Sequence, residues 1–390
     1  MDFQLTAEQA LLKSQAREFT MQTILPRVAH YDREAIFPWE IFDQAQERDL
    51  LHLSIPPSYG GRGLGVFEQV IVSEELARGC AGICAAVSLN ALAIAALLIA
   101  GTPGQQQRYF PRLLNGELCS FALTEAEAGS DVVALETSAT RPEEDLGDTY
   151  ILNGSKAWIS GAPDASVFLI FAKTNPTEGS RGISAFLVER IAPGLFVGAP
   201  QGKLGQHALP TAEVFLENVE VSRSALLGAP GEGFAVAMRV FDRSRPLVAA
   251  YGVGLIQRCL DEALAYATKR RTMGKPIIEH QAIGNKIAEM GMRLEAARLL
   301  TYQSAWLCDR GQPNTLQASY AKTFAADTAM WAASETLQIF GARGYSADFP
   351  LEKLFRDAKL LQIYEGTGEI QRTIMKKELT RLLARQGKSQ

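Results

Sequence analysis

The chain has 390 residues, of which 47% are hydrophobic and 21% charged, the balance of an ordinary folded protein with sizeable cores. Its formal net charge of −4 excludes the broad positive field that nucleic-acid binding needs. The five cysteines form no CxxC pair and have no neighbouring histidines, so we expect buried thiols rather than metal ligands or disulfides.

Residues 1–118 are predicted to form an N-terminal domain made entirely of helices. Helical runs are separated there by prolines and glycines. Thr6 and Gln9 have the spacing of a capping box ahead of Leu11 and Leu12, which predicts the start of a helix rather than a secretory leader. We therefore expect a cytoplasmic protein.

The stretch 81–101 holds no charged residue and reaches the length of a membrane span. It is rich in alanine, is interrupted by Ser88 and Asn90, and lacks basic and aromatic flanks. We therefore expect one fully buried helix here and no membrane span.

Residues 119–232 are predicted to form a central β domain. Asn153-Gly154 within "YILNGSKAW" is typical of a tight turn and predicts two strands joined as a hairpin. The runs "SVFLIFAKT", "GISAFLVER" and "TAEVFLENVEV" are rich in β-branched and aromatic residues. No helical pattern separates them, so we predict an antiparallel sheet rather than a parallel nucleotide-binding one.

Residues 233–390 are predicted to form a C-terminal four-helix bundle. One long helix carries apolar residues at alternating steps of four and three, namely Ile283, Ile287, Met290, Leu294 and Ala297. Such a stripe suits a bundle core or a subunit contact. The predicted fold class is therefore α+β, with an all-α domain, an antiparallel β domain and a helical bundle in that order.

Several familiar site patterns are absent from the sequence. "GGRGLG" at 60–65 does not follow a predicted strand, so it does not indicate a dinucleotide loop, and no Walker A sequence occurs. The four histidines are scattered, which supports neither a metal centre nor a Ser-His triad.

Three further motifs each have two interpretations. "LTEAEAGSDV" at 123–132 is either a turn or a place where small residues let a ligand approach the backbone. "KRRTMGKP" at 269–276 is either a phosphate site or a solvated helix end. In "FDRSRP", Asp242 and Arg245 stand three apart and either pair with each other or face a polar ligand.

A fourth motif, "IYEGTGEIQR" at 363–372, places Glu365 between an apolar run and two glycines. The carboxylate is either an exposed charge at a helix start or a base at a cavity wall.

In this order and spacing, these motifs resemble the acyl-CoA dehydrogenase family, most closely its medium-chain type. The likeness runs from about Thr6 to Leu382 and includes "WIS", "EHQAI" and "LQIFGARGYSADFPLEKLFRDAK". It implies an α/β/α subunit, usually in a homotetramer, that holds FAD between the β domain and the C-terminal bundle. A neighbouring subunit would complete the cofactor site.

The resemblance also implies which residues contact FAD. The matching positions are Phe121, Leu123, Thr124, Gly129, Ser130, Trp158, Ile159, Ser160, Thr367 and Glu369. Contacts across the interface are implied for Arg270, Thr272, His280 and Gln281. The adenosine end is implied to lie against Gln338, Ile339, Phe340, Gly341 and Ala342.

Glu365 matches the family's catalytic base, which removes the α-proton of an acyl-CoA thioester while the β-hydrogen leaves as hydride to flavin N5. The product would be a trans-2-enoyl-CoA, and an electron-transfer flavoprotein would reoxidise FAD. Apolar neighbours should raise the pKa of Glu365 toward neutrality. Substrate contacts are implied for Ser130, Asp242, Arg245, Tyr251 and Gly366. Some relatives place the base at the position of Ser244, but serine here leaves only Glu365.

Departures from the family pattern leave the substrate open. Ala126-Glu127 replaces a Pro-Gly, Ser160 replaces threonine, Ala342 replaces glycine, Tyr251 occupies a usually small position, and Cys84 and Ser88 stand at the pocket bottom. We expect a short- or medium-chain acyl-CoA dehydrogenase of fatty acid β-oxidation. The alternatives are a dehydrogenase or reductase for branched, cyclic or dicarboxylic acyl-CoA and, more distantly, a flavin-free binding or scaffold protein.

Overall fold

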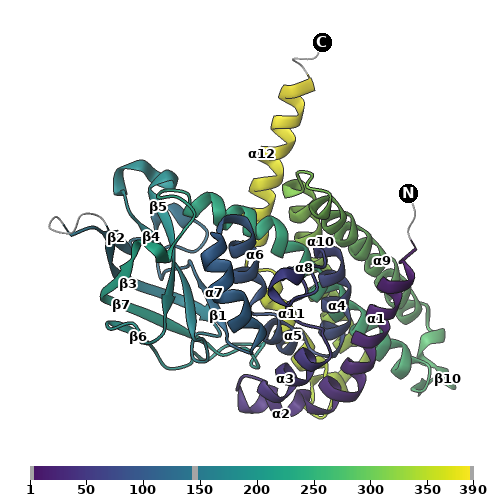
Figure 1. Ribbon diagram of the computed structural model, residues 1–390. Helices are drawn as coiled ribbons and strands as arrows, with labels where there is room; N and C mark the ends of the chain where they lie inside the picture. The colour runs from purple at the N-terminus through teal and green to yellow at the C-terminus, as the bar shows by residue number, and fades with distance from the viewer. Residues whose placement is uncertain (1–3, 143–147, 387–390) are drawn as a thin grey trace.

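The computed structural model describes residues 4–142 and 148–386 (Figure 1). The N-terminal helices are α1 (Ala7–Phe19), α2 (Val28–Glu34), α3 (Trp39–Glu47), α4 (Val66–Gly79), α5 (Ala81–Val87), α6 (Ala91–Ala100) and α7 (Pro103–Leu114). The predicted capping box of α1 is confirmed, because the Gln9 N–H donates to the Thr6 hydroxyl at 3.2 Å and the Gln9 side chain accepts from the Thr6 N–H.

The prediction of one helix over 81–101 is wrong, because α5 and α6 are separate and bent by 40° relative to each other. The Asn90 side chain at the break accepts from the Cys119 N–H at 2.8 Å and donates to the Glu117 carbonyl at 2.9 Å. A side chain committed to another segment in this way favours a turn over a continuous helix. Across residues 4–142 and 148–386 no single helix is long and apolar enough to cross a membrane, although this bent pair reaches that length and composition, and α5 is buried in the protein.

The central domain is an eight-stranded sheet in the order β6-β7-β3-β2-β4-β5-β8, with β1 paired to β4. Its strands are β1 (Cys119–Ala122), β2 (Ser138–Thr140), β3 (Thr149–Ser160), β4 (Val167–Lys173), β5 (Ile183–Glu189), β6 (Leu195–Val197), β7 (Thr211–Ser222) and β8 (Leu226–Leu227). The prediction of a purely antiparallel sheet is wrong, because β1 and β2 run parallel to β4. The chain between β1 and β4 forms β2 and β3 of the same sheet. The two parallel strands are therefore connected without a long helix between them.

The predicted hairpin at Asn153-Gly154 is also wrong, since both residues lie inside the continuous strand β3. The register of β3 against β7 shifts at this point, which is the mark of a β-bulge. Gly154 has φ +145°, and a Cβ there would come within 2.7 Å of the Thr137 backbone. The glycine therefore allows close approach of a neighbouring strand instead of a turn.

The C-terminal helices are α8 (Gly233–Ala267), α9 (Gln281–Asp309), α10 (Thr315–Phe340), α11 (Leu351–Leu361) and α12 (Gly368–Gln386). A small ribbon of β9 (Arg271–Thr272) and β10 (Lys275–Pro276) follows α8. The stripe predicted for α9 is confirmed, with Ile287, Met290, Leu294 and Ala297 buried and Ile283 packed on the same core. Figure 1 shows the sheet on one side of α6 to α8, the other helices on the opposite side, and α12 projecting outward.

The order of a helical domain, a sheet and a helical bundle agrees with the predicted fold class. Short π or 3-10 turns connect the elements at Thr20–Ile24, Leu25–Arg27, Pro57–Tyr59, Val132–Ala134, Pro176–Gly182, Arg223–Ala225, Ile277–Glu279 and Gly341–Tyr345. The cysteines are free thiols, and four of them are buried as expected. Within the described part of the chain, no group of three or more histidine, cysteine or carboxylate side chains could hold a metal ion.

Candidate active site

A cavity of about 600 Å³ lies where the sheet, α8 and the 364–366 turn meet. The structure brings many of the predicted site residues to its wall, namely Phe121, Leu123, Thr124, Gly129, Ser130, Trp158, Ile159, Ser160, Asp242, Arg245, Tyr251, Glu365 and Gly366. Two of the motifs left open, 123–132 and 241–246, therefore border the same space as Glu365.

The remaining predicted site residues lie outside this cavity. They are Arg270, Thr272, His280, Gln281, Gln338, Ile339, Phe340, Gly341, Ala342, Thr367 and Glu369. Some of them still form a local group, because the Thr272 hydroxyl lies 2.9 Å from His280 Nε2. The expected FAD contacts of Arg270, Thr272, His280 and Gln281 would come from a second copy of the chain.

Glu365 is a strained residue whose side chain is partly buried at the wall of the cavity. Its φ of +51° lies in the left-handed region, which costs roughly 1–3 kcal/mol for a side chain of this kind. The Ser244 hydroxyl donates to Glu365 Oε2 at 2.5 Å. Burial raises the pKa of Glu365, and this effect is opposed by the hydrogen bond from Ser244 and by the positive charges of Arg245 and Lys322. A raised pKa makes the ionised carboxyl a stronger base than an exposed glutamate.

The backbone of the 364–366 turn is held from several sides. Gln371 Nε2 donates to the Glu365 carbonyl at 3.0 Å, and Lys322 Nζ donates to the Gly366 carbonyl at 2.7 Å. Gly366 has φ +96°, and a Cβ there would lie 2.6 Å from Gln371 Nε2, so only glycine fits. In the part of the chain that the structure describes, no group accepts from the Glu365 N–H, which remains available to a ligand.

The predicted pairing of Asp242 with Arg245 is present, at 3.5 Å, although both side chains also line the cavity. Asp242 also accepts from the Thr315 hydroxyl at 2.6 Å. Arg245 is only 3% exposed, and its Nε donates to the Glu365 carbonyl at 3.3 Å. The two interpretations of this motif are thus compatible, because the ion pair itself forms part of the wall.

The wall of the cavity opposite α8 fits the flavin end of FAD. Trp158 is 58% exposed with φ +60°, so that a large aromatic face stands open to the cavity. A Cβ added to Gly129 would meet nothing within 4 Å, which leaves room for a ligand beside the backbone. Thr124, Ser130 and Ser160 add hydroxyls to this wall. An aromatic face with a few polar groups is what a planar, hydrogen-bonding ring needs.

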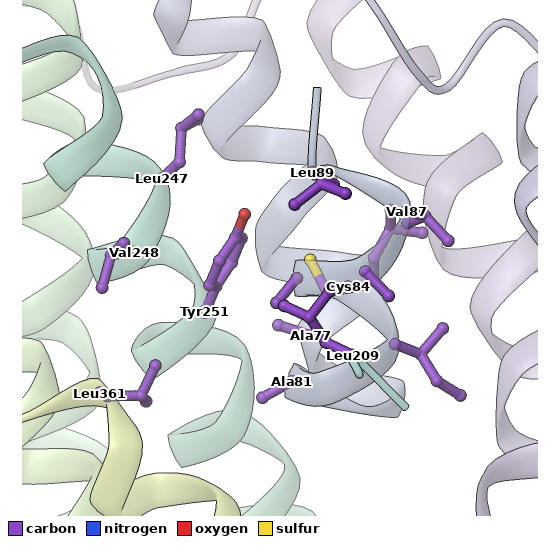
Figure 2. Close-up of a cluster of buried hydrophobic side chains, with 14 of the residues drawn as sticks. Ala77, Ala81, Cys84, Val87, Leu89, Leu209, Leu247, Val248, Tyr251 and Leu361 are labelled. Atoms are coloured by element: carbon purple, nitrogen blue, oxygen red, sulfur yellow. The ribbon is translucent and has the colours of Figure 1, made fainter. Parts of the chain in front are cut away.

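Tyr251 closes the cavity on the side of the N-terminal helices. Its ring points from α8 toward α5 (Figure 2). The Cys84 sulfur lies on the side of α5 that faces this ring. The side chain is 7% exposed, and burial raises the pKa of Tyr251 while a hydrogen bond with Ser88 opposes the increase. Tyr251 and Ser88 therefore line one end of the cavity, and Cys84 lies behind them without lining it.

The sequence does not predict the contacts that Ser244 and Lys322 make. The resemblance marks Ser244 only as a position where some relatives carry the base, and it implies no role for Lys322. The available signal for Lys322 was a single lysine among alanines in "ASYAKTFAADTA", since a lone charge on an otherwise small and apolar helix face needs a buried partner.

Models of three domains match nearly the whole chain. They are described as acyl-CoA dehydrogenase N-terminal domain for residues 6–117, middle domain for residues 120–219 and C-terminal domain for residues 231–380. The chain belongs to the acyl-CoA dehydrogenase family. It is therefore an oxidoreductase with FAD as cofactor, and the cavity wall described above fits that group.

Individual relatives cover the full length of the chain. Acryloyl-CoA reductase (NADH) of Anaerotignum propionicum is 39% identical over 380 residues, which are 97% of this chain and 96% of the relative. The protein of Caenorhabditis briggsae named "Probable medium-chain specific acyl-CoA dehydrogenase 2, mitochondrial" is 37% identical over 100% of this chain and 94% of its own.

Two solved structures show the same fold. Butyryl-CoA dehydrogenase from Megasphaera elsdenii has a TM-score of 0.94 and 35% identity, over 97% of this chain and 100% of its own. A chain from the structure described as electron transferring flavoprotein of Acidaminococcus fermentans has a TM-score of 0.93 and 37% identity, over 98% of this chain and 100% of its own.

Proposed function

We propose that this enzyme interconverts a short, uncharged acyl-CoA and its trans-2-enoyl-CoA, with Glu365 as the base for the α-proton. The observation that carries the proposal is the partly buried carboxyl of Glu365, whose pKa is raised and which borders the same cavity as the open face of Trp158. A thioester bound between them would present its α-carbon to the Glu365 carboxylate and its β-carbon to the wall with Trp158, which fits the flavin.

The chain's own groups supply the acid–base part of the reaction. The ionised Glu365 takes the α-proton, and its free N–H can donate to the thioester carbonyl oxygen, where negative charge develops. Ser244 holds the carboxyl by a hydrogen bond at 2.5 Å. FAD, when bound, supplies the acceptor for the hydride that leaves the β-carbon.

The closed end of the cavity supports a short acyl group. Tyr251 occupies the space into which a longer chain would extend, and its neighbours there are Ser88, Leu89 and Leu209. These residues carry no positive charge. A carboxylate at the far end of a dicarboxylic acyl group would be buried without a cation, which costs several kcal/mol. We therefore favour an uncharged acyl group, straight, branched or cyclic, over a dicarboxylic one.

The reverse reaction is a second candidate, because a relative with 39% identity is named a reductase of acryloyl-CoA. The same base would then return a proton to the α-carbon. We propose an electron-transfer flavoprotein as the redox partner and a homotetramer as the assembly. Measuring the rates of acyl-CoA oxidation and enoyl-CoA reduction with the same protein distinguishes the two directions.

The direct test uses the FAD-loaded protein and its Glu365→Gln variant. The glutamine keeps the shape of the side chain but cannot accept a proton, so we expect normal FAD content and a loss of roughly 10²–10⁴-fold in the rate of anaerobic flavin bleaching by a short acyl-CoA. Near-normal bleaching of the variant would contradict Glu365 as the base. A wild-type protein without bound flavin would contradict the proposal as a whole and favour the scaffold alternative.

A further inference from the structure

Lys322 is a fully buried lysine in the middle of α10. Its exposed fraction is 0%, and Ala318, Ala321 and Ala325 are buried beside it. Lysine is almost never fully buried unless it is paired. In the portion of the chain described here, its hydrogen bond goes to a backbone group, the Gly366 carbonyl, at 2.7 Å.

The partner of Lys322 belongs to the turn that carries Glu365. Gln371 Nε2 also donates to the Gly366 carbonyl, at 3.2 Å, and Arg245 Nε donates to the Glu365 carbonyl at 3.3 Å. The carbonyls of both residues are therefore bound by side chains of α8, α10 and α12. Fixing these two carbonyls fixes the left-handed backbone at Glu365, which directs the carboxyl and the free N–H.

We infer that Lys322 is a positioning residue for Glu365: it holds the Gly366 carbonyl so that the strained turn keeps its shape, and its charge favours the ionised form of the base. The inference rests on the proposed function, in which Glu365 accepts the α-proton. Lys322 itself does not line the cavity.

The charges around the base agree with this role. Burial lowers the pKa of Lys322 to about 8, and the largest effect that opposes this decrease is the negative charge of Glu365. In return, Lys322 is among the groups that lower the pKa of Glu365 against the effect of burial. The titratable and charged groups that face the pair are Arg245 and Tyr251 of α8, Asp327 of α10, Tyr364 of the turn and Glu369 of α12.

The direction of the pH effect follows from these charges. When Lys322 loses its charge, the ionised form of Glu365 loses a favourable interaction and the pKa of Glu365 rises. The base then stays protonated up to a higher pH. When a rate depends on ionised Glu365, the acidic limb of its pH–rate profile should therefore move to higher pH.

The test measures deuterium exchange at the α-carbon of a short acyl-CoA in which sulfur replaces the β-carbon. This thioester cannot lose a β-hydride, so the exchange reports the base without turnover of the cofactor. The FAD-loaded wild type, Lys322→Gln, Lys322→Met and Lys322→Arg are compared from pH 5 to pH 9. Lys376→Met removes the same charge from an exposed position on α12 and is the matched control.

We expect Lys322→Gln, which can still donate to the carbonyl, to move the acidic limb to higher pH with a plateau rate within a few-fold of wild type. Lys322→Met lacks both donor and charge, so its plateau should also fall about 10- to 100-fold through misplacement of the base. Lys322→Arg and Lys376→Met should keep the wild-type limb. The glutamine variant decides the question if the methionine variant does not fold.

An acidic limb at the wild-type pH in both Lys322→Gln and Lys322→Met would overturn the inference, whatever happens to the plateau. Failure of the proposed function is recognised separately. In that case the wild type would exchange no deuterium, or Glu365→Gln would exchange as fast as wild type.

Discussion

At the scale of single residues, Glu365 combines two unfavourable properties, a left-handed backbone and a partly desolvated carboxyl. Both are stabilised locally, by Gly366 next to it and by hydrogen bonds from Ser244, Arg245, Gln371 and Lys322 around it. Strained and desolvated groups of this kind concentrate where chemistry occurs.

Tyr251 is the residue at which the range of acyl chains can be tested. Tyr251→Gly opens the closed end of the cavity, so kcat/KM for an eight-carbon acyl-CoA relative to a four-carbon one should rise about tenfold or more, because each extra buried methylene contributes roughly 1 kcal/mol. Tyr251→Phe keeps the bulk and is the matched control, with a profile close to wild type. An unchanged chain-length series in the glycine variant would remove Tyr251 from the acyl site.

The sequence indicated Glu365 because a carboxylate between an apolar run and two glycines is unusual, and because the motif resembles a known family. It could not identify the partner of Lys322, because nothing in the neighbourhood of Lys322 along the chain shows that α10 packs against the 364–366 turn. Contacts between distant segments depend on tertiary packing, which local pattern does not determine.

At the scale of elements, the sequence predicted most helices and strands but misjudged two connections. The run without charges over 81–101 predicts one helix, whereas the chain breaks at Asn90, whose partners lie in and beside β1. Asn153-Gly154 predicts a turn, whereas both residues lie inside β3, where Gly154 permits the close approach of Thr137. In each case the local structure around the residue depends on its contact with a segment that is distant in the sequence.

Asn90 should therefore matter for stability well beyond its size. Asn90→Ala leaves the Cys119 N–H and the Glu117 carbonyl without their partner, at about 1–3 kcal/mol for each buried group. We expect a clearly lower midpoint of thermal unfolding. Asn175→Ala removes an exposed turn hydrogen bond to the Thr177 N–H and should change the midpoint little. Equal midpoints for the two variants would show that Asn90 does not stabilise the joint between α5 and α6.

At the scale of the whole molecule, the order of three segments was predictable because apolar periodicity changes from helix to strand and back. The mixed character of the sheet was not, since β1 pairs with a strand that follows β2 and β3 in the chain. The residues of the 269–281 region lie away from the cavity, and only the resemblance suggested a role for them.

Substitution of Arg270 tests whether a second copy of the chain completes the cofactor site. Arg270 and Arg271 are neighbouring exposed residues, but Arg271 donates locally to the Gly274 carbonyl, at 2.6 Å. If Arg270 contacts FAD across an interface, Arg270→Ala should lower the FAD content after gel filtration several-fold, while Arg271→Ala retains it. Sedimentation should show an oligomer for the wild type. A monomer with full FAD content would contradict a shared cofactor site.

The position of Tyr251 between α8 and α5 has a consequence for how new specificities could arise. The end of the cavity near Tyr251 is also lined by Ala85, Ser88 and Leu89, whereas Glu365 comes from the opposite end of the polypeptide. In the proposed function, replacing only the 81–92 stretch with that of a homologue should therefore change the preferred acyl group and leave the removal of the α-proton intact.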